Sequence, residues 1–146
     1  MAACPADLPE LDPSRRAAIL QRLESIPIFA TLGFERIRVG HGWFECTVPR
    51  QQQYDGIFES FHGGLLMTVA DSAAAIVSLT IWGSEARITT TDMSIRFLAP
   101  ARSAVRVFAQ AIKRGRTLAP VTANLWRDDA TLVAVAQVTY MRLADG

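Results

Sequence analysis

In the stretch FHGGLLMTVADSAAAIVSLTIW, residues 61–82, a phenylalanine is followed by a histidine and two glycines, and the rest is almost without charge. Its length and composition predict one helix from about Gly63 to Ile81, roughly 28 Å long at 1.5 Å per residue. Because this helix is apolar nearly all round, it needs other protein on most of its sides. Its one carboxylate, Asp71, argues against a membrane span. We therefore expect a helix buried at the centre of a soluble protein.

Alternation of apolar and polar residues on both sides of this stretch predicts strands that cover the helix. Residues 34–49 indicate two strands around a turn at 40–42. After Gly83, the odd-numbered residues 89–97 alternate with the even-numbered residues 90–98, and Pro100 ends the strand. Strands joined by hairpins form an antiparallel sheet, and a curved sheet wrapped around the helix gives an α+β class. The other alternating segments, separated by turns at 114–116 and 128–131, are 104–113, 117–127 and 132–143.

The first part of the chain predicts one short amphipathic helix within residues 11–29. Asp12 can cap its start, Pro13 suits the first helical position and Pro27 marks its end. The first 16 residues lack the basic start and apolar core of a signal peptide. We expect an N-terminal segment, 1–32, followed by one domain, 33–146, in a cytoplasmic protein.

Composition narrows the classes of partner. A chain of 146 residues fits one domain, and 15 basic against 14 acidic residues give no bulk attraction to nucleic acid. Cys4 and Cys46 are too few for a disulfide scaffold and lack the spacing of a zinc site, so we expect reduced thiols and no metal. We also expect no membrane partner.

Asp71 needs an explanation, because burying an unpaired carboxylate costs several kcal/mol. It could be structural, held by a backbone amide or a basic partner, or it could serve chemistry. The glycine pair favours chemistry: a helix N-terminus presents free N–H groups, and glycine lets a ligand approach them closely. Such a site can polarise a carbonyl and hold an oxyanion. The alternative is that Gly63 and Gly64 only permit a tight turn. The stripe of the helix that carries Asp71 also holds Thr68, Ser72, Ala75 and Ser78.

The spacing of the two features limits how they can cooperate. Gly63 and Asp71 are eight residues apart, about 12 Å along a helix. A nucleophile or base must lie about 3 Å from its target. Asp71 therefore cannot act on a carbonyl held by the Gly63 amide of its own chain. If both belong to one site, the acid comes from a second subunit, as in a twofold dimer with antiparallel helices and two equal sites.

Three segments in order resemble hot-dog-fold acyl-CoA thioesterases of the PaaI-like (phenylacetate-pathway) group. They are HGGLLMTVAD (62–71), TTTDMSIRFLAPAR (89–102) and IKRGRTLA (112–119), and the resemblance covers roughly residues 33–143. In that family a catalytic acid follows nine residues after the histidine of HGG, which is Asp71 here. The resemblance implies a hot-dog fold, an acyl- or aryl-CoA substrate, no cofactor beyond the coenzyme A of the substrate, and a homodimer that pairs into a homotetramer.

The resemblance also implies roles for individual residues. The Gly63 amide binds the thioester carbonyl, Asp71 of the partner subunit acts as nucleophile or general base, and Thr90 orients the acid or a water. His62 could be a general base, although its place before the helix favours a structural hydrogen bond. Substrate-binding residues carried over in this way are His62, Gly64, Glu59 and the hairpin residues Lys113, Arg114, Gly115, Arg116 and Thr117, which in the family lie near the CoA phosphates and pantetheine arm. A solvated turn is the alternative for this hairpin, and Arg102 is a weaker phosphate candidate.

One departure from the family keeps a second function open. Many relatives carry N-x-x-G-x-x-H-G-G, whereas this chain has Gly56 and Glu59 at the first two defined positions. The missing asparagine favours the alternative of a non-catalytic acyl-CoA-binding hot-dog protein. Asp55 and Glu59 are polar alternatives nearby, and we interpret Glu59 as a solvated loop charge rather than a second acid.

His41 is expected to be exposed, no GxSxG supports a Ser-His-Asp triad, and hydratase motifs are spaced differently. Candidates for an aromatic or medium-chain acyl pocket are Phe58, Phe61, Leu66, Met67 and Trp82.

Overall fold

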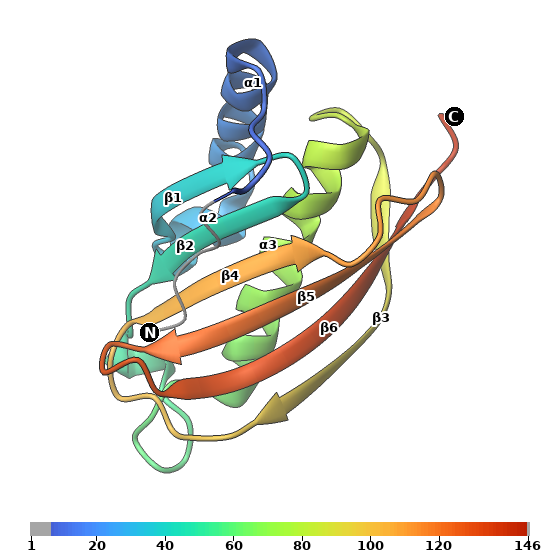
Figure 1. Cartoon of the computed structure of the whole chain (residues 1–146). Helices are drawn as coiled ribbons and strands as arrows, with labels where there is room; N and C mark the ends of the chain where they lie inside the picture. Colours follow the sequence, from blue (N-terminus) through green and yellow to red (C-terminus); the bar gives the residue numbers. More distant parts are fainter. Residues whose placement is uncertain (1–6, 146) are drawn as a thin grey trace.

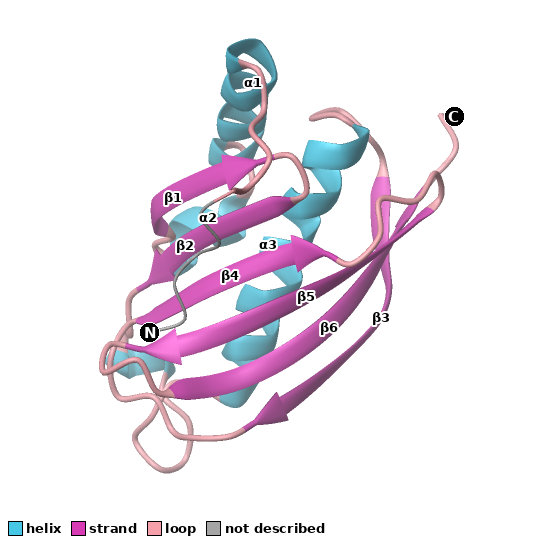
Figure 2. Ribbon diagram, viewed as in Figure 1, coloured by secondary structure: helices cyan, strands magenta, loops and turns pink. Residues whose placement is uncertain are grey.

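The computed structural model describes residues 7–145 and contains one long helix packed against a curved six-stranded antiparallel sheet (Figures 1 and 2). The helix, α3 (Gly63–Trp82), is one residue longer than predicted. The predicted α+β class and hot-dog architecture are confirmed. The strands are β1 (Glu35–Gly40), β2 (Trp43–Val48), β3 (Ile88–Phe97), β4 (Val105–Ala111), β5 (Leu118–Arg127) and β6 (Leu132–Arg142).

The strand order is β1-β2-β4-β5-β6-β3, so the strand that follows the helix lies at the far edge of the sheet. β3 pairs with β6, the last strand, and the chain then crosses from this edge to β4 beside β2. One long edge of β3 is therefore left without a partner strand within the described chain. This edge is close to Asp71, because Thr90 on β3 donates a hydrogen bond to it.

The alternation predicted for β3 is broken at Thr91. The pairing of β3 with β6 shifts between Thr90 and Asp92, so β3 has one more residue there than β6. Such a β-bulge changes which residues face the core on its two sides. Ile88 packs against the core before the bulge, and Met93 and Ile95 do so after it. Thr90 consequently faces the helix together with Met93, whereas the alternation alone assigned these residues to opposite faces.

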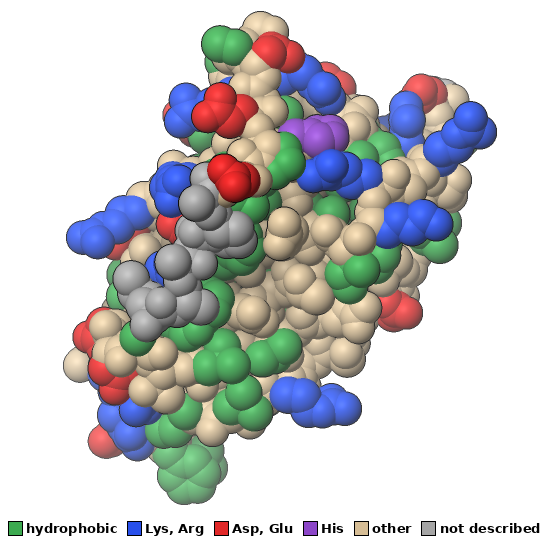
Figure 3. All heavy atoms as spheres, in the orientation of Figure 1, with side chains coloured by type: hydrophobic (Ala, Val, Ile, Leu, Met, Phe, Trp, Pro, Cys, Tyr) green, Lys and Arg blue, Asp and Glu red, His purple; other side chains and the backbone are tan. Residues whose placement is uncertain are grey.

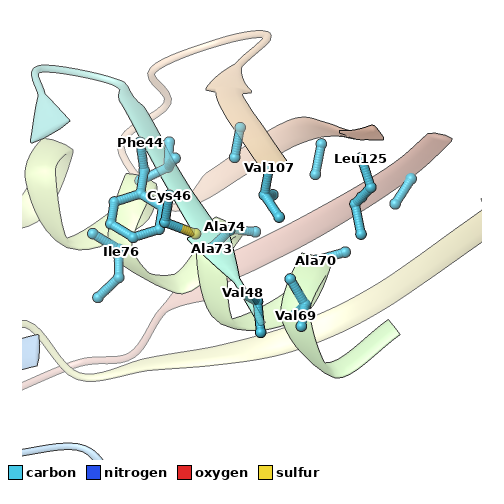
Figure 4. Packing of buried hydrophobic residues seen from close by; sticks show 14 of the residues in the cluster. Phe44, Cys46, Val48, Val69, Ala70, Ala73, Ala74, Ile76, Val107 and Leu125 are labelled. Atoms are coloured by element: carbon cyan, nitrogen blue, oxygen red, sulfur yellow. The ribbon is translucent and has the colours of Figure 1, made fainter. Parts of the chain in front are cut away.

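The core lies between α3 and the inner face of the sheet. Figure 4 shows Phe44, Cys46 and Val48 of β2 pointing toward the helix, where small Ala70, Ala73 and Ala74 allow close approach. By length and composition α3 could span a membrane, but 61% of its most apolar window is buried, so it is the core helix of the fold. Cys46 is a free thiol whose pKa is raised by burial, and Cys4 lies outside the described residues.

The predicted N-terminal helix is in fact two helices, α1 (Pro13–Glu24) and α2 (Pro27–Leu32). Asp12 caps α1 as expected, its Oδ1 accepting from the Arg15 N–H at 3.0 Å. Pro27 does more than end α1: proline suits the first position of a helix, and it begins α2 there. Both helices contribute buried side chains to the same core. The segment before α3 is irregular as predicted, apart from one 3-10 turn, η1 (Gln52–Tyr54).

Candidate active site

The polar stripe of α3 contains one side chain that reaches beyond the helix. Thr68 and Ser78 turn back and donate to the carbonyls four residues earlier, Gly64 at 3.0 Å and Ala74 at 2.9 Å. Asp71 instead points from a half-buried position toward β3 and β6. These two hydroxyls therefore bond to the helix itself, whereas the carboxylate is available to other partners.

Two neutral hydroxyl groups bind the Asp71 carboxylate. Thr90 Oγ1 donates to Asp71 Oδ1 at 2.8 Å, and Tyr140 Oη donates to the same oxygen at 3.0 Å. Within residues 7–145 no Lys, Arg or His forms a salt bridge with Asp71. Neither of the structural partners considered for Asp71, a backbone amide or a basic side chain, binds it among the described residues. We call Asp71, Thr90 and Tyr140 the carboxylate clamp.

Strand pairing explains how the clamp forms. Thr90 and Tyr140 are directly opposite each other in β3 and β6, and directly opposite residues project from the same face of an antiparallel sheet. The bulge at Thr91 gives Thr90 its inward direction, and Thr91 itself donates to the Thr139 carbonyl at 3.1 Å. Sequence reasoning missed Tyr140. The available signal was a tyrosine that ends the inward-facing series Ala134, Ala136, Val138 and Tyr140 of the last strand.

Tyr140 remains a proton donor. Burial raises the pKa of its phenol well above the ordinary value, a hydrogen-bonding interaction with Thr90 lowers that pKa, and the negative charge of Asp71 raises it further. The phenol is only 6% exposed. A phenol that keeps its proton can donate to a carboxylate at every pH near neutrality, so the clamp does not switch off in that range.

The N-terminus of α3 leaves one amide open. His62 caps the helix, and its Nδ1 accepts from the Gly64 N–H at 2.9 Å, which confirms the structural hydrogen bond predicted for this histidine. The Gly64 amide is therefore occupied, and a Cβ on Gly64 would lie 3.0 Å from the His62 ring. The Gly63 N–H makes no hydrogen bond with any other described residue. Of the glycine pair, Gly63 is the residue whose amide can bind a ligand, and substrate contact through His62 or Gly64 stays a prediction.

An uncharged depression opens at Gly63. Its walls come from residues 60–66 and 97–101, and its lining contains no Asp, Glu, Lys or Arg. Phe97 lies over Gly63, with a ring carbon 3.4 Å from the position that a Cβ would take. Of the residues expected to line an acyl pocket, Phe61 and Leu66 do line this depression. Met67 lies half-buried on the helix, Phe58 is 77% exposed, and Trp82 lies at the other end of α3.

Two arginines hold the loop before Gly63. Arg50 pairs with Asp55 and also donates to the Glu59 carbonyl at 3.0 Å, while Arg102 donates to the Phe58 carbonyl at 3.4 Å. The hydrogen bond from Arg50 lowers the pKa of Asp55, which is therefore engaged rather than available to replace the missing asparagine. Glu59 has a left-handed backbone with φ +54°, which accounts for the glycine found there in many relatives. Its side chain is exposed, as the solvated interpretation requires.

The basic hairpin lies at the opposite end of α3, roughly 28 Å from Gly63 along the helix. Basic side chains gather where β4 and β5 are connected, and hydrophobic ones at the other tip (Figure 3). Trp82 Nε1 donates to the Gly115 carbonyl at 2.9 Å, and the Thr117 carbonyl accepts from the Arg142 N–H at 2.8 Å. Lys113 and Arg116 are exposed. Within one chain the structure brings Asp71 and Thr90 together but keeps Gly63 and this hairpin far apart.

Arg114 differs from the other two cations of the hairpin. Its Nη2 donates to the His41 carbonyl at 3.1 Å, which ties the hairpin to the turn between β1 and β2. The expectation that His41 is exposed is wrong, because it is half-buried beneath this contact. Burial lowers the pKa of His41, and the nearby positive charge of Arg114 lowers it further. Among residues 7–145, no cluster of three or more His, Cys, Asp or Glu could hold a metal ion.

Comparison with known proteins identifies relatives of this arrangement. Residues 58–134, more than half of the chain, match the family described as the thioesterase superfamily. A thioesterase family protein from Silicibacter pomeroyi has a similar structure, with 28% identity and a TM-score of 0.81 over 90% of this chain and 99% of that one. The Escherichia coli PaaI protein from the phenylacetic acid degradation operon shares the fold at 19% identity, with a TM-score of 0.78 over 89% and 96%. None of the curated protein sequences matches the chain.

Proposed function

The chain belongs to the thioesterase superfamily and is a hot-dog-fold thioester hydrolase. We propose that it is of the PaaI-like type and hydrolyses acyl- or aryl-CoA at an active site shared by two subunits. In this proposal Asp71 of one subunit acts on a carbonyl that is held by the Gly63 amide of the other. We propose further that two such dimers form a cytoplasmic homotetramer. The products are the free acid and coenzyme A.

One observation carries the proposal: the clamped carboxylate and the open amide lie on the same straight helix. The helix is continuous from Gly63 to Trp82, so eight residues separate the two groups by about 12 Å. This is several times the reach of a base or nucleophile, which must lie about 3 Å from its target. Two chains related by a twofold axis remove this mismatch, because each contributes one carboxylate and one amide.

The free edge of β3 supports a specific way to pair the chains. An unpaired strand edge is a template for another strand, and β3 is ten residues long. Thr90 contacts Asp71 near one end of β3, and Phe97 lies over Gly63 at the other end. Antiparallel pairing of two β3 strands about an axis near their middle would bring Thr90 of one chain opposite Phe97 of the other. Gly63 of each chain would then approach Asp71 of its partner.

The mechanism uses only these groups. The Gly63 N–H binds the thioester carbonyl oxygen, at the positive end of the helix dipole, and stabilises the oxyanion that develops there. Asp71 either takes a proton from water, so that hydroxide attacks the carbonyl carbon, or attacks that carbon itself to give an anhydride that water then hydrolyses. In both routes the C–S bond breaks, and the sulfur leaves as the CoA thiolate, which is protonated in water.

The surfaces at the two ends of the chain support a CoA thioester as the substrate. The uncharged depression at Gly63 suits an apolar acyl or aryl group, since no charged side chain lines it. The exposed Lys113 and Arg116 suit the CoA phosphates. With the two α3 helices antiparallel, the hairpin of one subunit lies beyond the N-terminus of the other helix, in line with the pantetheine arm that leads away from the thioester.

A thiol-release screen over short, medium, long and aromatic acyl-CoAs tests the activity, with Asp71→Asn and Asp71→Ala as the critical variants. General-base catalysis contributes about 10²–10⁴-fold, so both should lose turnover on that scale while keeping fold and assembly. Glu24→Gln is the matched control, because this carboxylate lies exposed on α1, away from the β3 edge, and makes no hydrogen bond to the clamp. Full activity in Asp71→Asn would disprove the assignment.

Because Gly56 takes the place of the asparagine found in many relatives, the same set of acyl-CoAs should also be used to test the alternative of a non-catalytic binding protein. Gly56 has no side chain to hold a water, and its N–H is bound to the Ser60 carbonyl at 2.8 Å. Calorimetry with the same acyl-CoAs separates the two functions. Binding with steady thiol release supports the thioesterase, and tight binding with no release from any acyl-CoA supports the binding protein.

A further inference from the structure

The geometry points to Tyr140 as a positioning residue that, with Thr90, fixes Oδ1 of Asp71 and leaves Oδ2 as the oxygen that reacts. This inference rests on the proposed function, because it assigns a role within the site that contains Asp71. It adds a residue that sequence reasoning did not select, and it names one atom of the carboxylate for the chemistry.

Hydrogen-bonding capacity gives the first step. A carboxylate oxygen has two lone-pair sites. Thr90 Oγ1 at 2.8 Å and Tyr140 Oη at 3.0 Å both donate to Oδ1, which fills its two sites. No residue in the described range donates a hydrogen bond to Oδ2. Both donors are neutral hydroxyls, so they form no ion pair with the carboxylate, and the lone pairs on Oδ2 are left for a water or a carbonyl carbon.

The position of Tyr140 gives the second step. Its oxygen also lies 3.2 Å from the Asp71 backbone carbonyl, so one phenol contacts both the side chain and the main chain of the acid. Tyr140 is buried on β6, which is paired on both sides, by β5 and by β3. A buried side chain on a strand paired on both sides is held in place, and rigid donors hold a reacting group in one orientation.

The third step separates positioning from simple burial of a phenol. If the hydroxyl only satisfied its own need for a partner, its loss would change stability and leave turnover unchanged. If it orients Asp71, its loss lets the carboxylate rotate, which lowers the rate of the chemical step and leaves substrate binding intact. A change in kcat at constant KM is therefore the expected sign of positioning.

Steady-state kinetics of Tyr140→Phe, Thr90→Val and the double variant test the inference. A hydrogen bond to a charged group is worth about a factor of ten or more, so we expect each single change to lower kcat roughly tenfold with KM within about twofold. We expect the double change to cost at least the product of the two. Tyr54→Phe is the matched control, since Tyr54 is the only other tyrosine and is exposed. Wild-type kcat in Tyr140→Phe, or a rise in KM with unchanged kcat, would overturn the inference.

A second measurement does not depend on the Phe variant folding. In a Tyr54→Phe background, Tyr140 is the only tyrosine, so fluorotyrosine labelling gives a single fluorine NMR signal. That signal should shift in Asp71→Asn and stay in place in Glu24→Gln, where the altered carboxylate lies exposed on α1, and a signal unmoved by Asp71→Asn would contradict the contact. The two hypotheses fail differently: an active Asp71→Asn disproves the proposed function, whereas an inactive Asp71→Asn beside a fully active Tyr140→Phe disproves only the role of Tyr140.

Discussion

Asp71 and Gly63 lie on one helix but in surroundings of opposite kinds. Asp71 has its hydrogen-bond donors, Thr90 and Tyr140, supplied by its own chain. The Gly63 amide has no acceptor in the described part of the chain and faces an open, uncharged depression. One chain therefore supplies both donors that hold the carboxylate and leaves the Gly63 amide without an acceptor. The contrast indicates that each chain contributes one positioned carboxylate and one unoccupied amide, and that a second chain is needed to bring the two together in one site.

The largest expected effect, on kcat, comes from removing the Gly63 amide in one chain and the Asp71 carboxylate in another. Gly63→Pro removes the amide hydrogen at small structural cost, because proline suits the first helical position and His62, with ψ 128°, already has the extended backbone that precedes proline. Loss of one oxyanion donor should lower kcat about 10²–10³-fold. Asp71→Asn should be at least as inactive. Co-expressed with different tags, the two inactive chains form mixed dimers with one intact site and one doubly altered site.

Random mixing of equal amounts should restore about a quarter of the wild-type activity, since half of the dimers are mixed and each mixed dimer has one working site. Purifying the doubly tagged dimer should raise this to about half. Mixtures that stay as inactive as their parents would show that Gly63 and Asp71 do not meet across a subunit interface. Gly64→Ala serves as the comparison, because it keeps the Gly63 amide and disturbs only the His62 cap.

An intermediate effect separates the cations of the basic hairpin. Lys113 and Arg116 are exposed, whereas Arg114 holds the His41 carbonyl. Lys113→Ala with Arg116→Ala should raise KM for acyl-CoA about five- to tenfold and leave kcat unchanged, because the phosphates are remote from the reacting carbonyl. The increase should shrink when the substrate is an acyl-pantetheine without the nucleotide. An equal loss with both substrates would remove these residues from phosphate binding.

Arg114→Ala should behave differently, by lowering the melting temperature a few degrees through its lost contact with the β1–β2 turn, with a smaller change in KM. Thermal denaturation beside the kinetics tells the two classes apart. A KM increase for Arg114→Ala equal to that of the double variant would place all three cations at the phosphates.

Most of the fold could be predicted because its signals are local. The apolar run at 61–82 and the alternating segments gave the helix and the strands to within a few residues. The place of β3 at the far edge could not be derived in this way, since its paired residues in β6 lie between 37 (Phe97 with Ala134) and 54 (Ile88 with Arg142) positions later in the chain and no turn links the two strands. The second N-terminal helix was missed because a proline can both end one helix and begin the next.

The residues of the site also differ in whether local sequence signals could identify them. Gly63 and Asp71 could be selected from a motif and from helix geometry. Thr90 followed from the family resemblance, although alternation alone turned it away from the helix, and the bulge at Thr91 reconciles the two. A bulge leaves no clear mark in sequence, because it depends on pairing with a distant strand. Tyr140 was missed for the same reason: it reaches Asp71 only through the register of β6 with β3.

The smallest effect is expected in the loop before Gly63, where Glu59 keeps a left-handed backbone that a glycine would adopt more easily. A non-glycine residue in this region costs roughly 1 kcal/mol, part of which glycine returns through its freer unfolded chain. Glu59→Gly should therefore raise the melting temperature by about 1–3 °C. Glu59→Ala removes the same charge but keeps the strain, so it should leave the melting temperature near that of the wild type. Because the Glu59 side chain is exposed, both variants should bind acyl-CoA with KM within about twofold of the wild type. A KM increase shared by both variants would instead show that the Glu59 side chain contributes to substrate binding near Gly63. If Glu59→Ala raised the melting temperature as much as Glu59→Gly, the charge of Glu59 and not its backbone strain would be what destabilises this loop.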